Sequence, residues 1–419
     1  ATPVDWDPAY YRQVALNLVE GRGAVTQSLL FYGYQPQALP FPADLHWMPL
    51  PSRVLVPGLA LWEHGDQLVT VLLAATWAPL AWALGRDLGS DGRVAGALAL
   101  FGGGYLRFLS TPDSMALYGA LGGLALLAIA RQRWLVLALA LGLAALTRGD
   151  GLLLAPCLAL PLLARRRAWA VPLALVGPVV ALAWMVRCES VGGLGWGASR
   201  SLVFQTLDYS DFVLGLDAAP TPPERVAFAG RELLKALRVG LVASAFLLPW
   251  PAIWALWRRR RSWTEGLALY AVLMPMAALL LAPGVASSGS VFRSGAALFV
   301  GLCALSAVGF EALCRWRDYP RALPVLAFAL SSLALGLANA HLAPSQPWTC
   351  PPGEAPIFAS RPLLCERPAL LLAKGMHPRQ VRALAERYGV SEAWLTPDAG
   401  MAWSAGRETT IRLDELLPD

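Results

Sequence analysis

Charged residues are scarce in this sequence. Only 15% of the 419 residues are Asp, Glu, Lys or Arg, 56% are hydrophobic, and the mean hydropathy is +0.50. A soluble chain carries about 25% charged residues, so the composition excludes an ordinary soluble protein and indicates transmembrane helices. The net charge of +6 therefore reports orientation in a membrane and says little about nucleic acid.

Cysteines are few, and several catalytic motifs are missing. Six Cys are too few for a disulfide scaffold, and Cys157, Cys303 and Cys314 fall in apolar segments, where a buried thiol serves as a small hydrophobe. The sequence has no internal repeat, no zinc-type Cys/His spacing, no phosphate-cradling glycine loop and no Ser/His/Asp arrangement. Nothing in it supports a zinc enzyme, a P-loop enzyme or a serine hydrolase.

Apolar segments make up most of the chain. The sequence predicts an all-α polytopic helix bundle of about ten transmembrane segments between an external first loop (1–65) and a small soluble periplasmic α/β module (343–419). The bundle spans 66–342 and includes an external loop at 187–238. Its segments fall at about 66–85, 94–107, 114–130, 134–146, 151–164, 169–186, 239–257, 264–283, 295–313 and 322–341.

Arginine clusters orient the bundle. Five short loops between alternate segments carry 14 Arg, whereas the whole chain has only two lysines, Lys235 and Lys374. Basic residues concentrate in cytoplasmic loops, so these loops are assigned to the cytoplasm and both ends of the chain to the outside. The clusters are Arg86/Arg93, Arg131/Arg133, Arg165–Arg167, Arg258–Arg261 and Arg315/Arg317/Arg321.

Residues 134–164 test this assignment, because both flanks of this apolar stretch are rich in Arg. A hairpin that turns at Thr147-Arg148-Gly149-Asp150-Gly151 resolves the conflict. Each arm of about 14 residues rises only about 21 Å, so the turn lies below the outer surface of the hydrocarbon. Charge at that depth requires burial in protein or a wet cavity. We therefore expect an external, water-filled cavity, shaped by an Arg148–Asp150 ion pair that fixes the turn.

The external parts contain short elements of their own. Residues 8–20 predict an amphipathic helix at the membrane interface, through Val14, Leu16, Leu18 and Val19. The apolar stretch 54–62 is too short to span, and a helix is expected around 224–237. In the tail, Pro378–Tyr388 predicts a helix, and an oxidising compartment would allow Cys350 and Cys365 to pair. The predicted tail strands are Ala355–Ala359, Ala393–Thr396 and Thr409–Leu413.

Two aspartates stand at the start of the first external loop. Asp5 and Asp7 open the stretch Asp5-Trp6-Asp7-Pro8-Ala9-Tyr10-Tyr11. Two carboxylates at a water–lipid boundary suit an enzyme that deprotonates an acceptor whose partner substrate lies in the bilayer. Chains of this kind ordinarily export such a loop with a signal-anchor helix, so we expect one to precede Ala1.

Five short motifs follow one another along the chain, all in loops predicted to be external. They are Asp7-Pro8-Ala9-Tyr10-Tyr11, His46-Trp47-Met48-Pro49-Leu50-Pro51, Thr111-Pro112-Asp113-Ser114, Thr147-Arg148-Gly149-Asp150-Gly151 and Phe292-Arg293. This order resembles the GT-C class of lipid-dependent glycosyltransferases, such as protein O-mannosyltransferases, lipid A aminoarabinose transferase and RgtA/B/C/D-like proteins. The chain departs from that class in Gly149, where Pro is usual, and in its small tail.

The resemblance implies an integral-membrane glycosyltransferase. Such an enzyme takes a monosaccharide from a polyprenyl-phosphate donor and transfers it, with inversion, to a hydroxyl of an extracytoplasmic glycan, lipid or protein. It implies the bacterial inner membrane, with the active site facing the periplasm. A divalent cation, Mg²⁺ or Mn²⁺, could assist the reaction.

Asp7 is the expected general base, because it precedes the Pro-Ala-Tyr-Tyr run. Asp5 would share that role, position the acceptor, or join Asp7 in holding the metal. The alternative is that both are loop carboxylates and that Asp7 caps the following helix, with Pro8 at its first position. Asp113 is expected to orient the acceptor or a metal, or only to cap its own helix. His46 is expected to contact donor or acceptor, or to be a plain surface histidine.

Arg293 is the main candidate for holding the lipid phosphate, which a guanidinium binds through two hydrogen bonds. The alternative is an interfacial anchor for ordinary lipid headgroups. Trp6 or Trp47 could stack on a sugar. Further candidates for phosphate contact are Arg200, Arg53 and Arg107.

Two other functions remain open at this point. A transporter or flippase of lipid-linked sugars would favour inverted repeats and charges near the bilayer midplane, whereas this sequence has no repeat and carries its candidate carboxylates in loops. A non-catalytic assembly subunit would retain its fold after loss of Asp7, whereas an enzyme would lose its activity.

Overall fold

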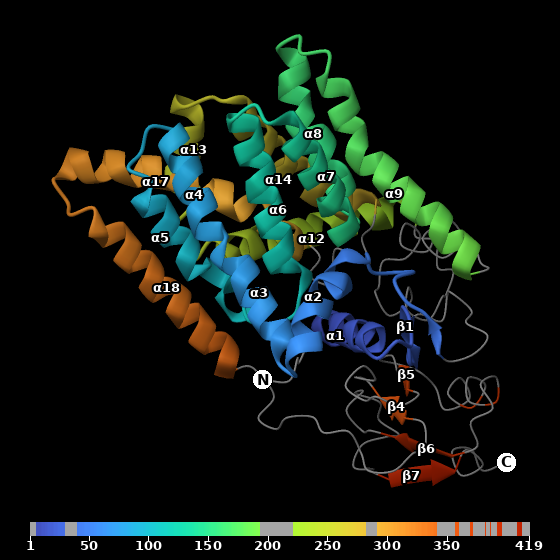
Figure 1. The fold of residues 1–419 in the computed structure, drawn as a ribbon. Coiled ribbons are helices and arrows are strands. Elements are labelled where there is room, and N and C mark those ends of the chain that lie inside the picture. The colour runs from blue at the N-terminus through green and yellow to red at the C-terminus, as the bar shows by residue number, and fades with distance from the viewer. Residues whose placement is uncertain are drawn as a thin grey trace.

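The computed structural model gives the structure of residues 6–29, 40–192, 221–281 and 291–341. In the tail it describes 357–359, 369–371, 392–395 and 409–412, together with Arg382 and Glu386. The described chain is a bundle of helices with strands of a small sheet below one end (Figure 1).

Four helical stretches are long and apolar enough to cross a membrane. They are Gly65–Asp87, made of α3 (Gly65–Ala75) and α4 (Trp77–Asp87), then α9 (Ala170–Gly192), α14 (Ser262–Leu281) and α17 (Ala296–Arg317). Shorter apolar helices accompany them, namely α6 (Ser114–Ala130), α7 (Trp134–Thr147), α8 (Gly151–Ala164) and α18 (Ala322–His341). The chain is thus a multi-pass membrane protein, and the total of ten spans stays a prediction.

Two of the expected spans are interrupted, so these predictions were wrong in detail. Residues 239–257 are shared between α12 (Pro222–Ala243) and α13 (Pro249–Arg258), and Ala245 and Phe246 between them have positive φ angles of 48° and 62°. Helix α13 begins at Pro249, because the fixed φ of proline suits the first turn of a helix and proline needs no amide hydrogen bond there.

The second interruption lies in the segment 94–107. Helix α5 (Arg93–Phe101) ends at Gly102, whose φ of 65° is the left-handed geometry that glycine adopts without steric cost. A short 3-10 helix, η2 (Gly103–Phe108), follows. The chain therefore turns aside before reaching Asp113 at the start of α6.

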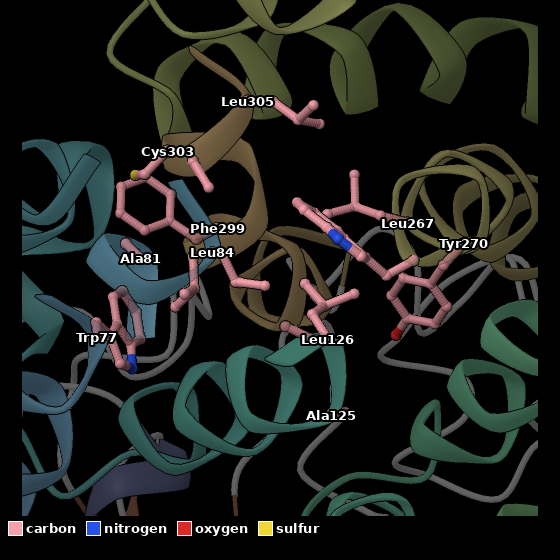
Figure 2. Close-up of a cluster of buried hydrophobic side chains, with 14 of the residues drawn as sticks. Trp77, Ala81, Leu84, Ala125, Leu126, Leu267, Tyr270, Phe299, Cys303 and Leu305 are labelled. Atoms are coloured by element: carbon pink, nitrogen blue, oxygen red, sulfur yellow. The ribbon is translucent and has the colours of Figure 1, made fainter. Parts of the chain in front are cut away.

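Helix α17 lies at the centre of the bundle. In the apolar stretch of α17, 78% of the residues are buried, whereas in the apolar stretch of the peripheral helix α9 the buried share is 22%. Figure 2 shows Trp77 and Leu84 of α4 close to Phe299 and Cys303 of α17. Small residues let α6 approach α17, because a Cβ at Gly122 would lie 2.7 Å from the Ala297 Cα. This close approach is typical of helix packing in membranes.

The described residues before α3 form two helices and several short strands. Helix α1 (Trp6–Val19) matches the expected helix 8–20, and α2 (Leu50–Leu61) contains the apolar stretch 54–62. The interfacial role of α1 was only partly right: Val14 is fully buried and only Val19 is exposed, because α1 packs against α2. Strand β1 (Val25–Thr26) pairs antiparallel with β3 (Phe41–Pro42).

A five-stranded sheet joins this loop to the tail. Its order is β2-β5-β4-β6-β7, from β2 (Ser28–Leu29), β5 (Ala369–Leu371), β4 (Ile357–Ala359), β6 (Glu392–Leu395) and β7 (Thr409–Arg412). All neighbours are parallel except β6 and β7. Strands β4, β6 and β7 lie where the sequence predicted strands, whereas β2 and β5 were not predicted.

The remaining tail predictions concern residues that are mostly outside the described part. Cys350 and Cys365 lie outside it, and of the helix Pro378–Tyr388 only Arg382 and Glu386 are described. Both are helical, and they form an ion pair of 3.0 Å. The division of the chain at 65 and 343 stays a prediction, and strand β2 shows that the first loop and the tail share one sheet.

Candidate functional site

The site is centred on Asp7 at the start of α1. This helix begins at Trp6, so Asp7 lies within its first turn and is not the N-cap residue of the alternative interpretation. A carboxylate in the first turn interacts favourably with the helix dipole. The Asp7 side chain is 15% exposed, which leaves it reachable yet largely removed from bulk water.

Arg293 lies between two carboxylates. Its Nε is 3.4 Å from Asp7 Oδ2 and 3.4 Å from Asp113 Oδ2, and the Asp113 side chain is fully buried. The short helix α16 (Val291–Ser294) carries Arg293. Three segments that are far apart in the sequence thus meet at one guanidinium.

Aromatic packing holds α16 in this position. The Tyr105 hydroxyl of η2 donates a hydrogen bond of 2.8 Å to the Phe292 carbonyl, and the two rings lie 4.6 Å apart. Phe108 also packs on Phe292, with ring centroids 5.6 Å apart. The residue before Arg293 is therefore fixed, which limits how far the guanidinium can move.

Asp113 serves two roles at once. Its Oδ1 accepts hydrogen bonds from the Met115 backbone N–H at 3.3 Å and from the Ser114 hydroxyl at 2.9 Å, so it caps α6 as the sequence suggested. Its other oxygen faces Arg293. Capping and participation in the site are therefore compatible in this residue.

The hairpin turn between α7 and α8 is linked to the site through Arg148. The Arg148 Nε donates to Asp150 Oδ1 at 2.9 Å, which confirms the predicted ion pair. Arg148 also reaches the Ser114 hydroxyl at 3.4 Å and the Ser294 hydroxyl at 3.5 Å. Ser114 directly follows Asp113 in the sequence, and Ser294 directly follows Arg293. The turn is therefore joined to the cluster formed by Asp7, Asp113 and Arg293.

Two tyrosines that the sequence analysis missed lie next to this turn. The Tyr270 hydroxyl donates to Asp150 Oδ2 at 3.0 Å, and it lies 2.9 Å from the Tyr118 hydroxyl. Both rings are buried in apolar helices. A buried Tyr hydroxyl usually finds a partner, so a tyrosine within an apolar segment is the signal that could have identified them.

Trp47 lies beside Tyr10 and near Asp7. Its side chain hydrogen-bonds to the Asp7 carboxylate, and its ring lies 4.2 Å from the ring of Tyr10. The imidazole of His46 packs edge-on against Trp47 at 5.1 Å. The structure therefore brings His46 next to the group that contacts Asp7, rather than to Asp7 itself.

Burial raises the pKa of the Asp7 carboxyl above its ordinary value of 3.8. The positive charges of Arg293 and Arg148 and the Trp47 hydrogen bond act in the opposite direction, while the charge of Asp113 raises the pKa further. A raised pKa makes the carboxylate a better proton acceptor, which is the property that a general base requires. Burial also raises the pKa of the neighbouring Tyr11 hydroxyl, which therefore stays protonated.

Not every predicted site residue joins this cluster. Arg53 forms an ion pair with the buried Asp44 and donates to the Pro49 carbonyl at 3.0 Å. Its charge is thus matched by Asp44, and its part in phosphate binding stays a prediction. Asp5, Arg200 and the side chain of Arg107 lie outside the described residues.

The divalent cation stays a prediction, because Asp5, one of its two expected ligands, lies outside the described residues. Among the described residues, no three His, Cys, Asp or Glu side chains gather as in a metal site built entirely from protein ligands, whereas Mg²⁺ is usually held by one or two carboxylates together with substrate phosphates. Asp7 and Asp113 both contact the Nε of Arg293. An arginine between two carboxylates already supplies the positive charge that a metal ion would bring.

Comparison with known proteins identifies the fold. No protein-family model and no curated protein sequence matches the chain. Two crystal structures of ArnT from Cupriavidus metallidurans are similar, one bound to undecaprenyl phosphate and the other in the apo state. Each alignment covers 96% of this chain and 90% of ArnT, with 14% sequence identity and a TM-score of 0.55. The chain thus has the ArnT fold, which bears out the GT-C resemblance at the level of architecture.

Proposed function

We propose that the protein is an integral-membrane glycosyltransferase that takes a monosaccharide from a polyprenyl-phosphate donor. The ArnT fold over nearly the whole chain supports this class, since ArnT is an aminoarabinose transferase and was crystallised with undecaprenyl phosphate. The observation that carries the proposal is the largely buried Asp7 carboxylate, with its raised pKa, in contact with Arg293.

The reaction is a single displacement with inversion. The acceptor hydroxyl oxygen forms a bond to the anomeric carbon while the bond from that carbon to the phosphate oxygen breaks. Asp7 accepts the hydroxyl proton, and the phosphate leaves with the electron pair of the broken bond. A positioned base contributes roughly 10²–10⁴-fold to such a rate.

Arg293 is the residue that stabilises the leaving phosphate. A guanidinium offers donors in a planar fork that matches phosphate oxygens, and the 18% exposure of its side chain leaves it accessible at the surface of the cluster. Charge developing on the phosphate is offset by such a cation. Asp113 orients Arg293 from its buried side, and His46 and Trp47 border the space where the acceptor binds. Asp5 and Arg200 remain further candidates for contact with the substrates.

The proposed setting is the bacterial inner membrane, with about ten spans and the site open to the periplasm. The external loop of residues 1–65 carries the base, residues 66–342 form the bundle, and residues 343–419 form a periplasmic module. The acceptor is a glycan, a lipid or a protein outside the cytoplasm.

A transfer assay in membranes tests this function with radiolabelled polyprenyl-phosphate sugars. Wild-type protein should transfer one of the sugars, and Asp7→Asn should reduce the rate by roughly 10²–10⁴-fold. Asp91→Asn is the matched control, because Asp91 pairs with Arg93 and Arg321 on loops assigned to the cytoplasm. Equal rates for wild type and Asp7→Asn would refute Asp7 as the base. No transfer from any donor would favour a transporter or an assembly subunit.

A further inference from the structure

Helices α13 and α17 both end in arginines that stand beside exposed tryptophans. Helix α13 ends at Arg258 and the chain continues through three more arginines to Arg261, whereas α17 ends at Arg317. Helix α17 begins at Ala296, directly after the helix that carries Arg293, and its 22 residues rise about 33 Å. That rise crosses a membrane, so the end of α17 lies on the face of the bundle opposite to the candidate site.

Helix α13 packs along α17 and runs in the same direction (Figure 1). The Ser306 hydroxyl donates to the Leu248 carbonyl at 2.8 Å, and a Cβ at Gly309 would lie 2.7 Å from the Pro251 Cα. The two contacts advance by three residues on both helices, so the helices proceed together. The last turns of α13 and α17 therefore reach the same face of the bundle.

Helix α13 directs its tryptophans outward. Ala252 and Ala255 are buried, whereas Trp250, Ile253 and Trp257 are exposed. The ten residues of α13 rise about 15 Å, which is half of the roughly 30 Å of hydrocarbon in a bilayer. The helix thus lies within one leaflet, and its exposed rings face lipid near the interface, where tryptophan is enriched.

The arginines of these two helix ends lie over the faces of the tryptophans. The Arg258 Cζ is 5.4 Å from the ring centre of Trp257 and 5.8 Å from that of Trp254. The Arg317 Cζ is 4.0 Å from the ring centre of Trp316, whose side chain is 71% exposed. Stacking of this kind uses the flat face of the guanidinium and leaves its in-plane N–H donors for an oxyanion.

Acidic side chains near this face pair with other arginines. Glu265 pairs with Arg165 at 2.8 Å, and Asp91 pairs with Arg321 at 3.8 Å. In the part of the chain that the structure describes, no carboxylate forms an ion pair with the exposed arginines of the two helix ends, which are Arg258–Arg261, Arg315 and Arg317. The surface therefore keeps a strong positive charge that calls for an anionic partner.

We propose that this surface binds the phosphate headgroup of an anionic phospholipid in the adjoining leaflet. The surface, which we call the arginine–tryptophan patch, consists of Trp257, Arg258–Arg261, Arg315, Trp316 and Arg317. A guanidinium fork matches the oxygens of a phosphate, and the exposed rings lie at the depth where the glycerol and upper acyl chains begin. Basic surfaces between helices on the cytoplasmic side of membrane proteins bind headgroups of this kind.

Orientation in the membrane would not require this arrangement. The positive-inside rule needs only basic residues in short loops, and the loop with Arg131 and Arg133 satisfies it. The patch adds exposed rings under the guanidinium groups and joins two neighbouring helix ends. It lies far from Asp7 and Arg293, so this inference is independent of the proposed transferase activity.

Native mass spectrometry of the full-length protein in detergent, titrated with phosphatidylglycerol, tests the patch through the Kd of the first bound lipid. The double variant Arg258→Gln and Arg317→Gln should weaken binding about fivefold for each arginine removed. The double variant Trp257→Leu and Trp316→Leu keeps the charge and an apolar surface, and it should weaken binding about threefold through loss of the stacking. Unchanged binding in the arginine variant would overturn the proposal.

The matched control removes the same charge from the same face. Arg131→Gln with Arg133→Gln takes two exposed arginines from the loop between α6 and α7, and it should leave the Kd nearly unchanged. Equal weakening in this control and in the patch variant would show general electrostatic attraction and overturn a defined site. All these side chains are exposed, so an unchanged Tm in detergent should confirm that the variants fold.

Two further titrations identify the ligand. Phosphatidylcholine, whose headgroup carries its own cation, should bind more weakly than phosphatidylglycerol and equally to the wild type and the arginine variant. Inorganic phosphate at the concentration of the lipid should not displace phosphatidylglycerol. Displacement by inorganic phosphate, or a loss of phosphatidylcholine binding equal to that of phosphatidylglycerol, would overturn the assignment to an anionic lipid.

Discussion

The guanidinium of Arg293 and the carboxylate of Asp7 form an ion pair of 3.4 Å. The pair joins the short helix α16 to the first turn of α1. The contact joins the group proposed to receive the proton with the group proposed to receive the phosphate. The positive charge of Arg293 lowers the pKa of Asp7, so substitution of Arg293 changes the titration of Asp7 as well as the chemistry.

Replacement of Arg293 by Gln should both slow the reaction and raise the pH that it requires. The positive charge of Arg293 lowers the pKa of Asp7, and the base works only when ionised. Without that charge the pKa rises, and the acid limb of kcat moves to higher pH. The plateau rate should fall by roughly 10²–10³-fold, because the leaving phosphate loses its cation. A pH profile of sugar transfer measures both effects, and a lower rate with an unmoved acid limb would contradict the electrostatic link.

Replacement of Asp113 by Asn should move the acid limb in the opposite direction. The negative charge of Asp113 raises the pKa of Asp7, so its removal lowers that pKa and extends activity to lower pH. Asn retains the capability to cap α6, whereas Asp113→Ala should also cost about 1 kcal/mol of stability. The same pH profile, measured for both variants, separates the electrostatic effect from the loss of the cap.

Replacement of Asp150 by Asn should destabilise the bundle. Its partner Arg148 is only 11% exposed, and removal of one member of a buried ion pair typically costs about 3–5 kcal/mol. The apparent Tm of the purified protein in detergent, followed by tryptophan fluorescence, should therefore fall by several degrees. Glu386→Gln is the control, because its pair with Arg382 is exposed and should contribute at most about 1 kcal/mol. Similar Tm values for the two variants would argue against a buried pair at the turn.

Replacement of Gly122 by Ala should weaken the contact between α6 and α17. A Cβ at this position would lie 2.7 Å from the Ala297 Cα, within backbone that cannot give way. Overpacking of this kind costs about 1–3 kcal/mol. Gly230→Ala in α12 is the matched control, since nothing lies within 4 Å of its added Cβ, and it should be neutral or stabilising by up to about 1 kcal/mol. Thermal unfolding of both variants in detergent gives the comparison.

Sequence reasoning located the helices of the bundle because long apolar runs and Arg clusters are local signals. It identified the turn at Arg148 and Asp150 for the same reason, since an apolar stretch with two cytoplasmic flanks has to fold back. It did not find the break at Ala245 and Phe246, because the residues there are as apolar as those of a continuous span.

The meeting of Asp7, Asp113 and Arg293 was less accessible to sequence reasoning. Each residue was singled out by its position in a loop, but which charges pair depends on how helices pack over long sequence separations. Asp44 carried no signal at all, because a left-handed aspartate and its partner Arg53 look like any two charges in a polar loop.

Strand β2 has a consequence for how the protein is made. Its partner β5 belongs to the tail, so Ser28 and Leu29 lack this partner until the helices of the bundle and the start of the tail have been synthesised. A pairing between such distant parts of a chain forms slowly, because a large loop must close first. The loop with the acidic motif is therefore synthesised before the bundle but completed only after it, and a ribosome-stalled chain that lacks the tail should carry an open strand edge for a chaperone to cover.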